Sequence, residues 1–359
     1  MENINLVKHS YKDDCIFLLK DLTDKIQEIT IQEKEELIRS GVSYSEMISK
    51  ESIPSKDIKN IFLNILNRDK KLIAYYVAKI SEIIYRQKGN KLVIVSLARA
   101  GTPYGILIRK YLKLKYKVDI PHYSISIIRD KGIDSNALKY ILTENKKAEI
   151  QFVDGWTGKG SITKELNKSI DIFNNENKTN IDNSLAVISD PAKLCKVCGT
   201  REDFGIATCC LNSTVSGLIS RTIHNEKYIG KDEFHGAKTL YYLKDEDYSQ
   251  YFIDKIDNEF KKISIKYEDL VLENIDKEYS MKIVSKIREL YDVNNINNIK
   301  LSVGESARVL LRRDPRVVLV KNKSDKNIEH ILKLAEEKGV KVIEYKDSEY
   351  NCISIINER

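Results

Sequence analysis

A glycine-rich loop is the first stretch of the sequence whose residue types could do chemistry. In IQFVDGWTGKGS, residues 150–161, an apolar run ends at Asp154 and continues into Gly155 and then a glycine-rich segment that precedes a helical pattern. Glycines leave backbone N–H groups uncovered, and at the start of a helix such groups can hold a phosphate. The residues that offer N–H groups, hydroxyls or charge are Thr157, Gly158, Lys159, Gly160 and Ser161.

This loop is not a nucleoside triphosphate loop of the Walker type. That pattern requires a glycine at position 153, which is Val153, and Ser or Thr after Lys159, where Gly160 stands. Two interpretations therefore remain open from the loop alone, a phosphate-binding loop or an ordinary glycine-rich turn.

Polar tips follow three further apolar runs. VSLARAGTP, residues 95–103, ends in Arg99, Ala100 and Gly101; YSISII is followed by Arg129 and Lys131; SLAVISD ends at Asp190. Ligands of parallel sheets bind beyond the carboxyl ends of the strands. We therefore expect these tips to lie together with the glycine loop.

Cysteines form the second chemical constellation. Cys195 and Cys198 precede the adjacent pair Cys209 and Cys210 in CKVCGTREDFGIATCC. Two pairs are a zinc pattern, but adjacent cysteines cannot easily both turn to one tetrahedral ion, so we predict no metal site. Cys210 precedes a helix-like segment, where a thiol can become acidic and nucleophilic. The alternative is that these thiols only pack in the core, as we expect for Cys15 and Cys352.

Histidines supply the candidate bases for such a nucleophile. His122, His224 and His235 are the candidates, whereas His9 and His330 are expected at the surface.

A basic cluster near the end of the chain is a candidate nucleic-acid surface. Arg308, Arg312, Arg313 and Arg316 surround one predicted helix and the strand after it. Such a cluster suits contact with an RNA backbone, although a charged run is also common on a solvated helix face. No aromatic residues are interleaved with it, so base stacking is not predicted.

The elements that would position these residues divide the chain into four parts. Residues 1–90 are predicted to be mainly helical, because apolar residues recur at steps of three and four in IKNIFLNILNRDKKLIAYYVAKISEIIYRQ. Residues 91–240 alternate apolar strands with helical segments, which predicts an α/β layer with a parallel sheet. Residues 241–299 read as a helical extension that ends in a linker, and 300–359 as a small α/β domain.

Composition limits the class of protein. The 359 residues are 42% hydrophobic and 31% charged, which is enough apolar material for packed cores in two or three units. The formal charge of +7 suits anionic partners. No run approaches the roughly 20 apolar residues of a membrane span, and MENINLVKHSYKDD has no secretion core, so we expect a cytoplasmic protein without a membrane partner.

Several long strings together resemble one family. VSLARAGTPYGILIRKYL, HYSISIIRDKGID, FVDGWTGKGSI, GTREDFGIATCCLNSTVSGLISRT and FHGA are similar to phosphoribosyltransferase-like proteins of bacterial tellurite-resistance and stress operons, the StiP-type family, whose members also carry a cysteine-protease name. SVGESARVLLRRDPRVVLVKN resembles the Pelota-type RNA-binding domain of these proteins.

This resemblance implies a type I phosphoribosyltransferase-like core, with the helical N-terminal region before it and a Pelota-like domain after it. Asp154 would hold the ribose hydroxyls of phosphoribosyl diphosphate (PRPP), and the loop from Thr157 to Ser161 its 5′-phosphate. Arg99, Ala100 and Gly101 would face the diphosphate with Mg²⁺, and Arg129 would close over it. Gly155 stands where the family pattern has a second acid, a contact that Asp190 would replace.

The function predicted on this basis is transfer of ribosyl phosphate from PRPP to an unknown acceptor. Two alternatives belong to other classes. One is a cysteine hydrolase or protease with Cys210 as its nucleophile, and the other is a non-catalytic RNA-binding regulator that senses a nucleotide.

Overall fold

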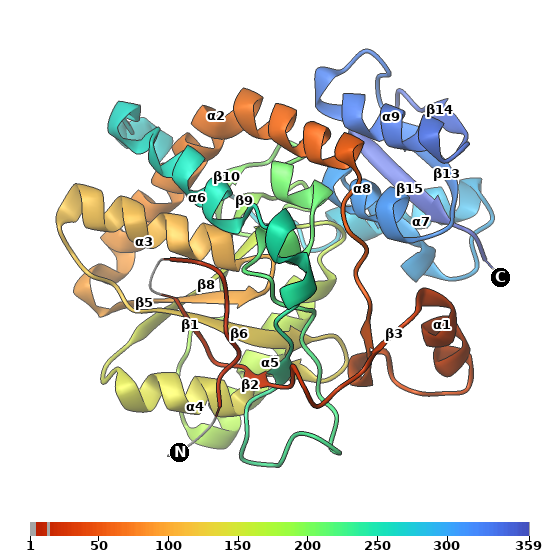
Figure 1. Ribbon diagram of the computed structural model, residues 1–359. Coiled ribbons are helices and arrows are strands. Elements are labelled where there is room, and N and C mark those ends of the chain that lie inside the picture. The colour runs from red at the N-terminus through yellow and green to blue at the C-terminus, as the bar shows by residue number, and fades with distance from the viewer. Residues whose placement is uncertain (1–4, 13–14, 359) are drawn as a thin grey trace.

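The main sheet of the protein is parallel. The computed structural model describes residues 5–12 and 15–358 (Figure 1). Its largest sheet has the strand order β1-β6-β5-β8-β9-β10, and β7 pairs antiparallel with β6. The predicted α/β class with a parallel sheet is confirmed. The strands are β1 (Ile16–Phe17), β5 (Leu92–Ala98), β6 (His122–Ile128), β7 (Gly132–Ile133), β8 (Glu149–Trp156), β9 (Leu185–Ser189) and β10 (Val197–Thr200).

Helices cover both faces of this sheet, which explains why its strands are continuous apolar runs. In β5, Ile94 packs into the core that contains the buried side of α2, whereas Val93 and Val95 pack into the core on the opposite face, with Leu138 and Leu166. The helices are α2 (Lys56–Lys88), α3 (Thr102–Tyr116), α4 (Ser135–Glu144), α5 (Ser161–Asn177) and α6 (Ser249–Asp257). None of the described helices is long and apolar enough to cross a membrane.

The first 90 residues are more than a helical region. They contain α1 (Ile31–Arg39) and α2, but also β2 (Lys20–Asp21), β3 (Glu28–Ile29) and β4 (Ile48–Ser49). β1 joins the main sheet beside β6, and β2 pairs with β11 (Gly236–Ala237). Since α2 buries Phe62, Ile73 and Val77 in the core on one face of that sheet, this region is a layer of the core domain.

The C-terminal unit has its own sheet, with the order β12-β15-β13-β14. Its elements are α7 (Tyr279–Leu290), β12 (Ile299–Leu301), α8 (Val303–Arg312), β13 (Pro315–Val320), α9 (Glu329–Glu337), β14 (Val342–Glu344) and β15 (Cys352–Ile356). The unit begins before residue 300, because α7 buries Ile283, Val284 and Ile287 in the same cluster as β12, β13 and β15. The stretch predicted to be a linker, residues 293–300, is likewise packed, with Val293 and Ile299 buried.

The two units share a core. Val303, Ala307 and Leu310 of α8 pack in one cluster with Ile206 and Ala207 of the core domain. Asp203 joins the units by hydrogen bonds: its carboxylate accepts the N–H groups of Val303 (2.9 Å), Asn351 (3.0 Å) and Cys352 (3.4 Å). In Figure 1 the C-terminal unit lies beside one end of α2, with α8 toward the core domain.

Asp203 predicts a pH dependence of this docking. Burial raises the pKa of its carboxyl group to about 7, although the three N–H groups oppose the rise. The folded protein therefore keeps a proton that the unfolded chain releases near pH 4, so the contribution to stability is complete below about pH 4 and is lost as pH rises toward 7. In urea titrations, Asp203→Asn should remove a fall on the order of 4 kcal/mol in unfolding free energy across this range.

The matched control is Glu202→Gln, because the neighbouring Glu202 is exposed. It should keep the wild-type profile. Parallel profiles for wild type and Asp203→Asn would contradict the assignment.

Candidate functional site

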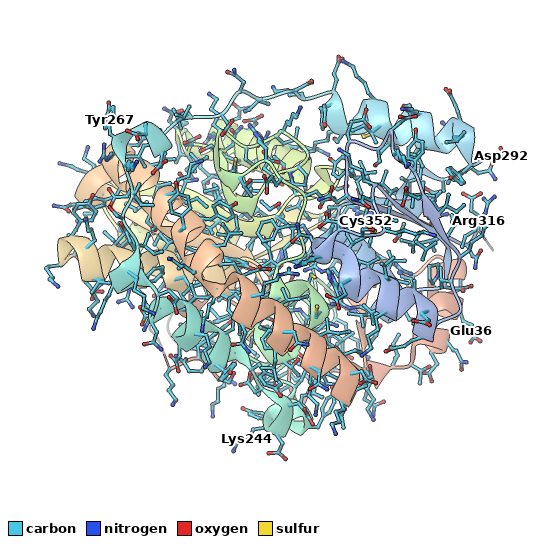
Figure 2. The ribbon with its side chains drawn as sticks, turned by 90° about the horizontal axis from the view of Figure 1, so that it is seen from above. Glu36, Lys244, Tyr267, Asp292, Arg316 and Cys352 are labelled. Atoms are coloured by element: carbon cyan, nitrogen blue, oxygen red, sulfur yellow. The ribbon has the colours of Figure 1, made fainter. Side chains whose placement is uncertain are left out.

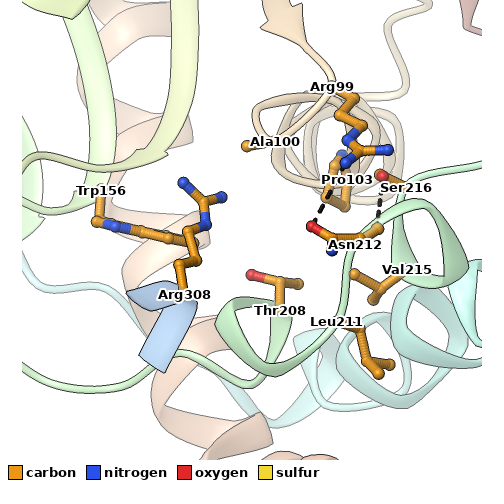
Figure 3. Close-up of a pocket in the computed structure, with 10 residues that line it drawn as sticks. All are labelled: Arg99, Ala100, Pro103, Trp156, Thr208, Leu211, Asn212, Val215, Ser216 and Arg308. Atoms are coloured by element: carbon orange, nitrogen blue, oxygen red, sulfur yellow. Dashed lines mark hydrogen bonds between the residues drawn. The ribbon is translucent and has the colours of Figure 1, made fainter. Parts of the chain in front are cut away.

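A small pocket lies where the carboxyl ends of β5 and β8 meet the C-terminal unit (Figure 3). Its volume is about 20 Å³, room for a single water molecule. The tip after β5, the end of β8, the 3₁₀ turn η3 (Ala207–Cys210) and α8 all contribute to it. The lining residues are Arg99, Ala100, Pro103, Trp156, Thr208, Leu211, Asn212, Val215, Ser216 and Arg308.

The glycine loop lies at this edge of the sheet, and hydrogen bonds within the core domain hold its acids. Asp154 accepts the N–H of Gly155 at 2.8 Å, and burial raises the pKa of Asp154 to about 6. Asp190 accepts the hydroxyl of Thr157 at 2.6 Å and forms an ion pair with Arg201. The structure thus brings Asp190 to the loop, as expected from the sequence, but as a buried anchor of Thr157.

Gly155 has a packing reason for lacking a side chain. A Cβ at this position would lie 2.8 Å from Cε2 of Tyr104. The Tyr104 ring is buried, and its hydroxyl bonds that of Thr208 at 2.6 Å. A second acid after Asp154 would displace this ring, so the site is built around the tyrosine.

The C-terminal unit covers the loop. Tyr350 donates its hydroxyl to the carbonyl of Gly158 at 3.1 Å, and Ser280 donates to that of Lys159 at 3.2 Å. Lys159 donates to the carbonyl of Ile296 at 2.6 Å, and burial lowers the pKa of Lys159 to about 8. Gly160 takes φ +83° before α5, which Ser161 begins. The loop residues thus bind another part of the same chain.

The residues of the second tip lie at different depths. Arg99 pairs with Glu51 at 2.5 Å and, with Ala100, lines the pocket. Gly101 lies against the sheet, where a Cβ would meet the carbonyl of Val153 at 2.3 Å. Arg129 is exposed beyond β6 and does not line the pocket.

The predicted RNA-binding arginines divide between two environments. Arg308 enters the pocket, where its guanidinium lies 4.3 Å from the centre of the Trp156 ring and its Nη1 donates to Glu305 at 3.0 Å. Arg312 lies one turn further along α8 and is half-buried. Arg313 and Arg316 are exposed, and Figure 2 shows Arg316 at the outer edge of the molecule.

Cys209 and Cys210 are buried in η3, with their sulfur atoms 3.9 Å apart. The pKa of Cys209 is lowered, first by a hydrogen bond from the Cys210 thiol and then by the His330 ring and the charge of Arg308, against the effect of burial. The pKa of Cys210 is raised, first by its hydrogen bond to Cys209 and then by burial. These opposite shifts favour the thiolate on Cys209 over Cys210, the residue singled out in the sequence, although either thiol can donate the hydrogen bond between them.

His330 is the functional candidate that the sequence reading missed. It was expected at the surface, but only 4% of it is exposed, because α9 packs Ile331, Leu334 and Ala335 into the shared core. Since His330 precedes Leu334 by one helical turn, it lies on the same face. That spacing was the available signal.

No histidine or cysteine of the described residues lines the pocket, and the remaining ones lie in other surroundings. His122 contacts Ser96 at 2.8 Å and Cys15 at 3.8 Å, and burial lowers the pKa of His122 to about 3. The rings of His224 and His235 are 4.9 Å apart. Burial raises the pKa of both Cys195 and Cys198. Across residues 5–12 and 15–358, no group of three or more His, Cys, Asp or Glu side chains is arranged to hold a metal ion.

Comparisons with known proteins define the class first. A model of the PELOTA RNA binding domain matches residues 278–358, which places such a domain after the α/β core. A model described as "Tellurite-like stress resistance cysteine protease StiP" matches residues 9–257, so the chain belongs to the StiP family.

A curated relative and a solved structure complete the comparison. The chain is 33% identical to "Cysteine protease StiP" of Acinetobacter baylyi, over 97% of this chain and 94% of the relative. A hypoxanthine-guanine-xanthine phosphoribosyltransferase aligns with 38% of this chain and 79% of its own at 11% identity, with a TM-score of 0.24. A similarity this weak carries no argument.

The predicted transfer of ribosyl phosphate from PRPP is wrong on this evidence. The relative that covers nearly the whole chain is named a cysteine protease, which agrees with the alternative of a cysteine hydrolase. The Mg²⁺ expected to accompany PRPP is not tested by these matches.

The lowered pKa of Cys209 predicts how its reactivity depends on pH. Only the thiolate is alkylated, so the rate of iodoacetamide modification at Cys209, mapped by mass spectrometry, should reach half its maximum below the value of an ordinary thiol. His330→Ala removes a group that lowers this pKa and should move the midpoint upward. Cys352, whose pKa is raised by burial, is the internal reference. An unchanged midpoint would show that His330 does not act on Cys209.

Proposed function

We propose that the protein is a cysteine hydrolase that cleaves peptide bonds, with Cys209 as nucleophile and His330 as its proton-transfer partner. The observations that carry the proposal are the buried Cys209–Cys210 pair, with sulfur atoms 3.9 Å apart, and the buried His330 ring, which lowers the pKa of Cys209 from a different unit of the chain. The name of the Acinetobacter baylyi relative supports the reaction class.

The chemistry follows from these two groups. The Cys209 thiolate attacks the peptide carbonyl carbon, and a C–S bond forms while the C–N bond breaks. The His330 imidazolium donates its proton to the departing amine. Water then hydrolyses the thioester and releases the acid, and the thiol is restored.

Cys209 is buried and does not itself line the pocket, but its neighbours in the chain do. Thr208 and Leu211 line the pocket and stand on either side of the cysteine pair in the chain. Because the pocket has room for one water, a peptide reaches Cys209 only when the side chains of Trp156 and Arg308 move apart. The α8 helix therefore controls entry.

An alkylating activity probe, from which the thiolate displaces a carboxylate, tests the nucleophile. A peptidyl acyloxymethyl ketone should label the wild-type chain on Cys209, lose this labelling in Cys209→Ala, and label His330→Ala at least about tenfold more slowly, as expected for loss of general acid–base assistance. Cys210→Ala should retain labelling at Cys209, because the lone thiol keeps His330 beside it.

The control is Cys195→Ala, since Cys195 is as buried as Cys209 but its pKa is raised by burial. Labelling that survives in Cys209→Ala and disappears in Cys210→Ala would transfer the role to Cys210 and overturn the proposal for Cys209.

We further propose that the C-terminal unit binds RNA through its exposed basic residues. The Pelota match supports RNA as the partner. Arg313, just after α8, and Arg316, near the start of β13, are both exposed. Arg308 has its guanidinium on Trp156, so we assign it to the pocket.

Salt-dependent binding tests the RNA surface. Arg313→Ala combined with Arg316→Ala should weaken binding of a structured RNA and reduce the dependence of log K on log salt by about 1 to 2, since each lost phosphate contact contributes about 0.7 to 0.9. Lys244→Ala, an exposed cation of the core domain, should leave both quantities unchanged. Equal effects of the two sets of changes would show that only general charge is involved.

We propose, finally, a phosphoribosyltransferase-like architecture for the core, used here for other chemistry. The glycine loop after β8 and the Arg99 tip after β5 support it, because both open helices at one edge of a parallel sheet.

A further inference from the structure

Unpaired guanidinium groups lie beside the pocket. Within the described part of the chain, Nε and Nη2 of Arg312 and Nε of Arg308 are buried without a hydrogen-bond partner. Burying such N–H groups without an acceptor is costly, so a partner for them is expected. The Nε and Nη2 atoms form one edge of the guanidinium, and this edge matches the two oxygens of a carboxylate.

Two of the three arginines in this region form ion pairs with glutamates, and two N–H groups of the third, Arg312, have no partner among the described residues. Glu51 pairs with Arg99, and Glu305 pairs with Arg308 at 3.0 Å. Arg312 is close enough to feel all four groups, and its pKa is lowered to about 9, first by burial and next by the charge of Arg308. The buried Asp154 carboxyl also interacts with the charge of Arg308, so what this cluster lacks, in the part of the chain that the structure describes, is an acceptor at the Nε and Nη2 edge of Arg312.

The cluster faces the reacting region. Figure 3 shows the Arg99 and Arg308 side chains on two sides of the pocket, with Thr208 between them on the turn that carries Cys209. The contacts given for the Arg308 guanidinium are a partly exposed ion pair within its own helix and the face of the Trp156 ring. Because these contacts are weak, the side chain can turn toward a ligand. A group held between these arginines lies within a few bonds of η3.

We propose that this arginine cluster is a carboxylate-binding site that selects the substrate. It would hold the acidic side chain of a peptide, or the peptide's terminal carboxylate, next to the bond that Cys209 attacks. This rests on the proposed peptide hydrolysis. A carboxylate fits better than a phosphate group, because the unpartnered edge of Arg312 presents two N–H groups for two oxygens and the pocket is narrow.

The single tryptophan of the chain reports binding without turnover. Trp156 lines the pocket and lies against Arg308, so its fluorescence changes when a ligand engages that arginine. The titration uses the full chain carrying Cys209→Ala, and the probes are acetylated, amidated pentapeptides of alanine with Glu or Gln at the centre. The Glu peptide should give a saturable change in Trp156 fluorescence. The Gln peptide should bind at least about tenfold more weakly.

A second pair of probes identifies the source of the carboxylate. Acetylated tetra-alanine with a free carboxyl terminus is compared with its amide. Binding of the free acid in preference to the Glu peptide assigns the site to chain ends, and the reverse order assigns it to acidic side chains. Tighter binding of inorganic phosphate than of either carboxylate would overturn the proposal.

Variants test the residue. Arg312→Gln should weaken the preferred carboxylate probe about tenfold or more. Arg288→Gln, an exposed arginine of α7, should not. The comparison of Glu with Gln peptides does not depend on the folding of Arg312→Gln. Equal binding of every acid and its neutral partner, or no fluorescence change, overturns the carboxylate site even if the activity probe labels Cys209. Selective binding without probe labelling rejects the hydrolase instead.

Discussion

The packing of α8 against η3 and the strand tips is the constraint on which the rest of the structure depends. Val303, Ala307 and Leu310 complete a core that begins in the other unit, and the Asp203 carboxylate holds three N–H groups across the boundary. Thr208 and Cys209 belong to one unit, while Arg308 and His330 belong to the other. The candidate site therefore exists only while the two units are docked.

The docking of the C-terminal unit also determines what the glycine loop contacts. Its glycines suit a loop that closely approaches a small ligand. In this structure the same glycines allow close approach of other parts of the protein. At Gly155 the neighbour is the Tyr104 ring, and at Gly158 a Cβ would lie 2.9 Å from Cγ of Glu305. Loops without side chains at strand ends allow close contact with whatever lies there, and in this chain much of what lies there is protein.

The sequence was informative wherever a pattern within one element determines burial. Strands covered on both faces are continuous apolar runs, so β5, β6, β8 and β9 could be predicted, and with them the edge where Arg99, Asp154 and Asp190 meet. The helical spacing of apolar residues in α2 was equally clear. The contact between units was not predictable in this way, because periodicity shows which face of α8 or α9 is buried but not what covers it. His330 was expected at the surface for this reason, and the place of Arg308 in the pocket was not foreseen.

The prediction of function had the same limit, because the reaction also depends on contacts that no single element shows. A resemblance of the strand tips to those of phosphoribosyltransferases led to the wrong reaction, because an architecture places residues at an edge without fixing their chemistry. In this chain the chemistry depends on which side chains converge there. Asp154 and Asp190 are bound by Gly155 and Thr157, whereas Cys209 has a hydrogen-bond donor, an imidazole and a nearby guanidinium. Since a buried thiol without such neighbours has a raised pKa, as Cys352 does, the three neighbours of Cys209 account for its lowered pKa and are the reason to propose it, rather than a packing cysteine, as the nucleophile.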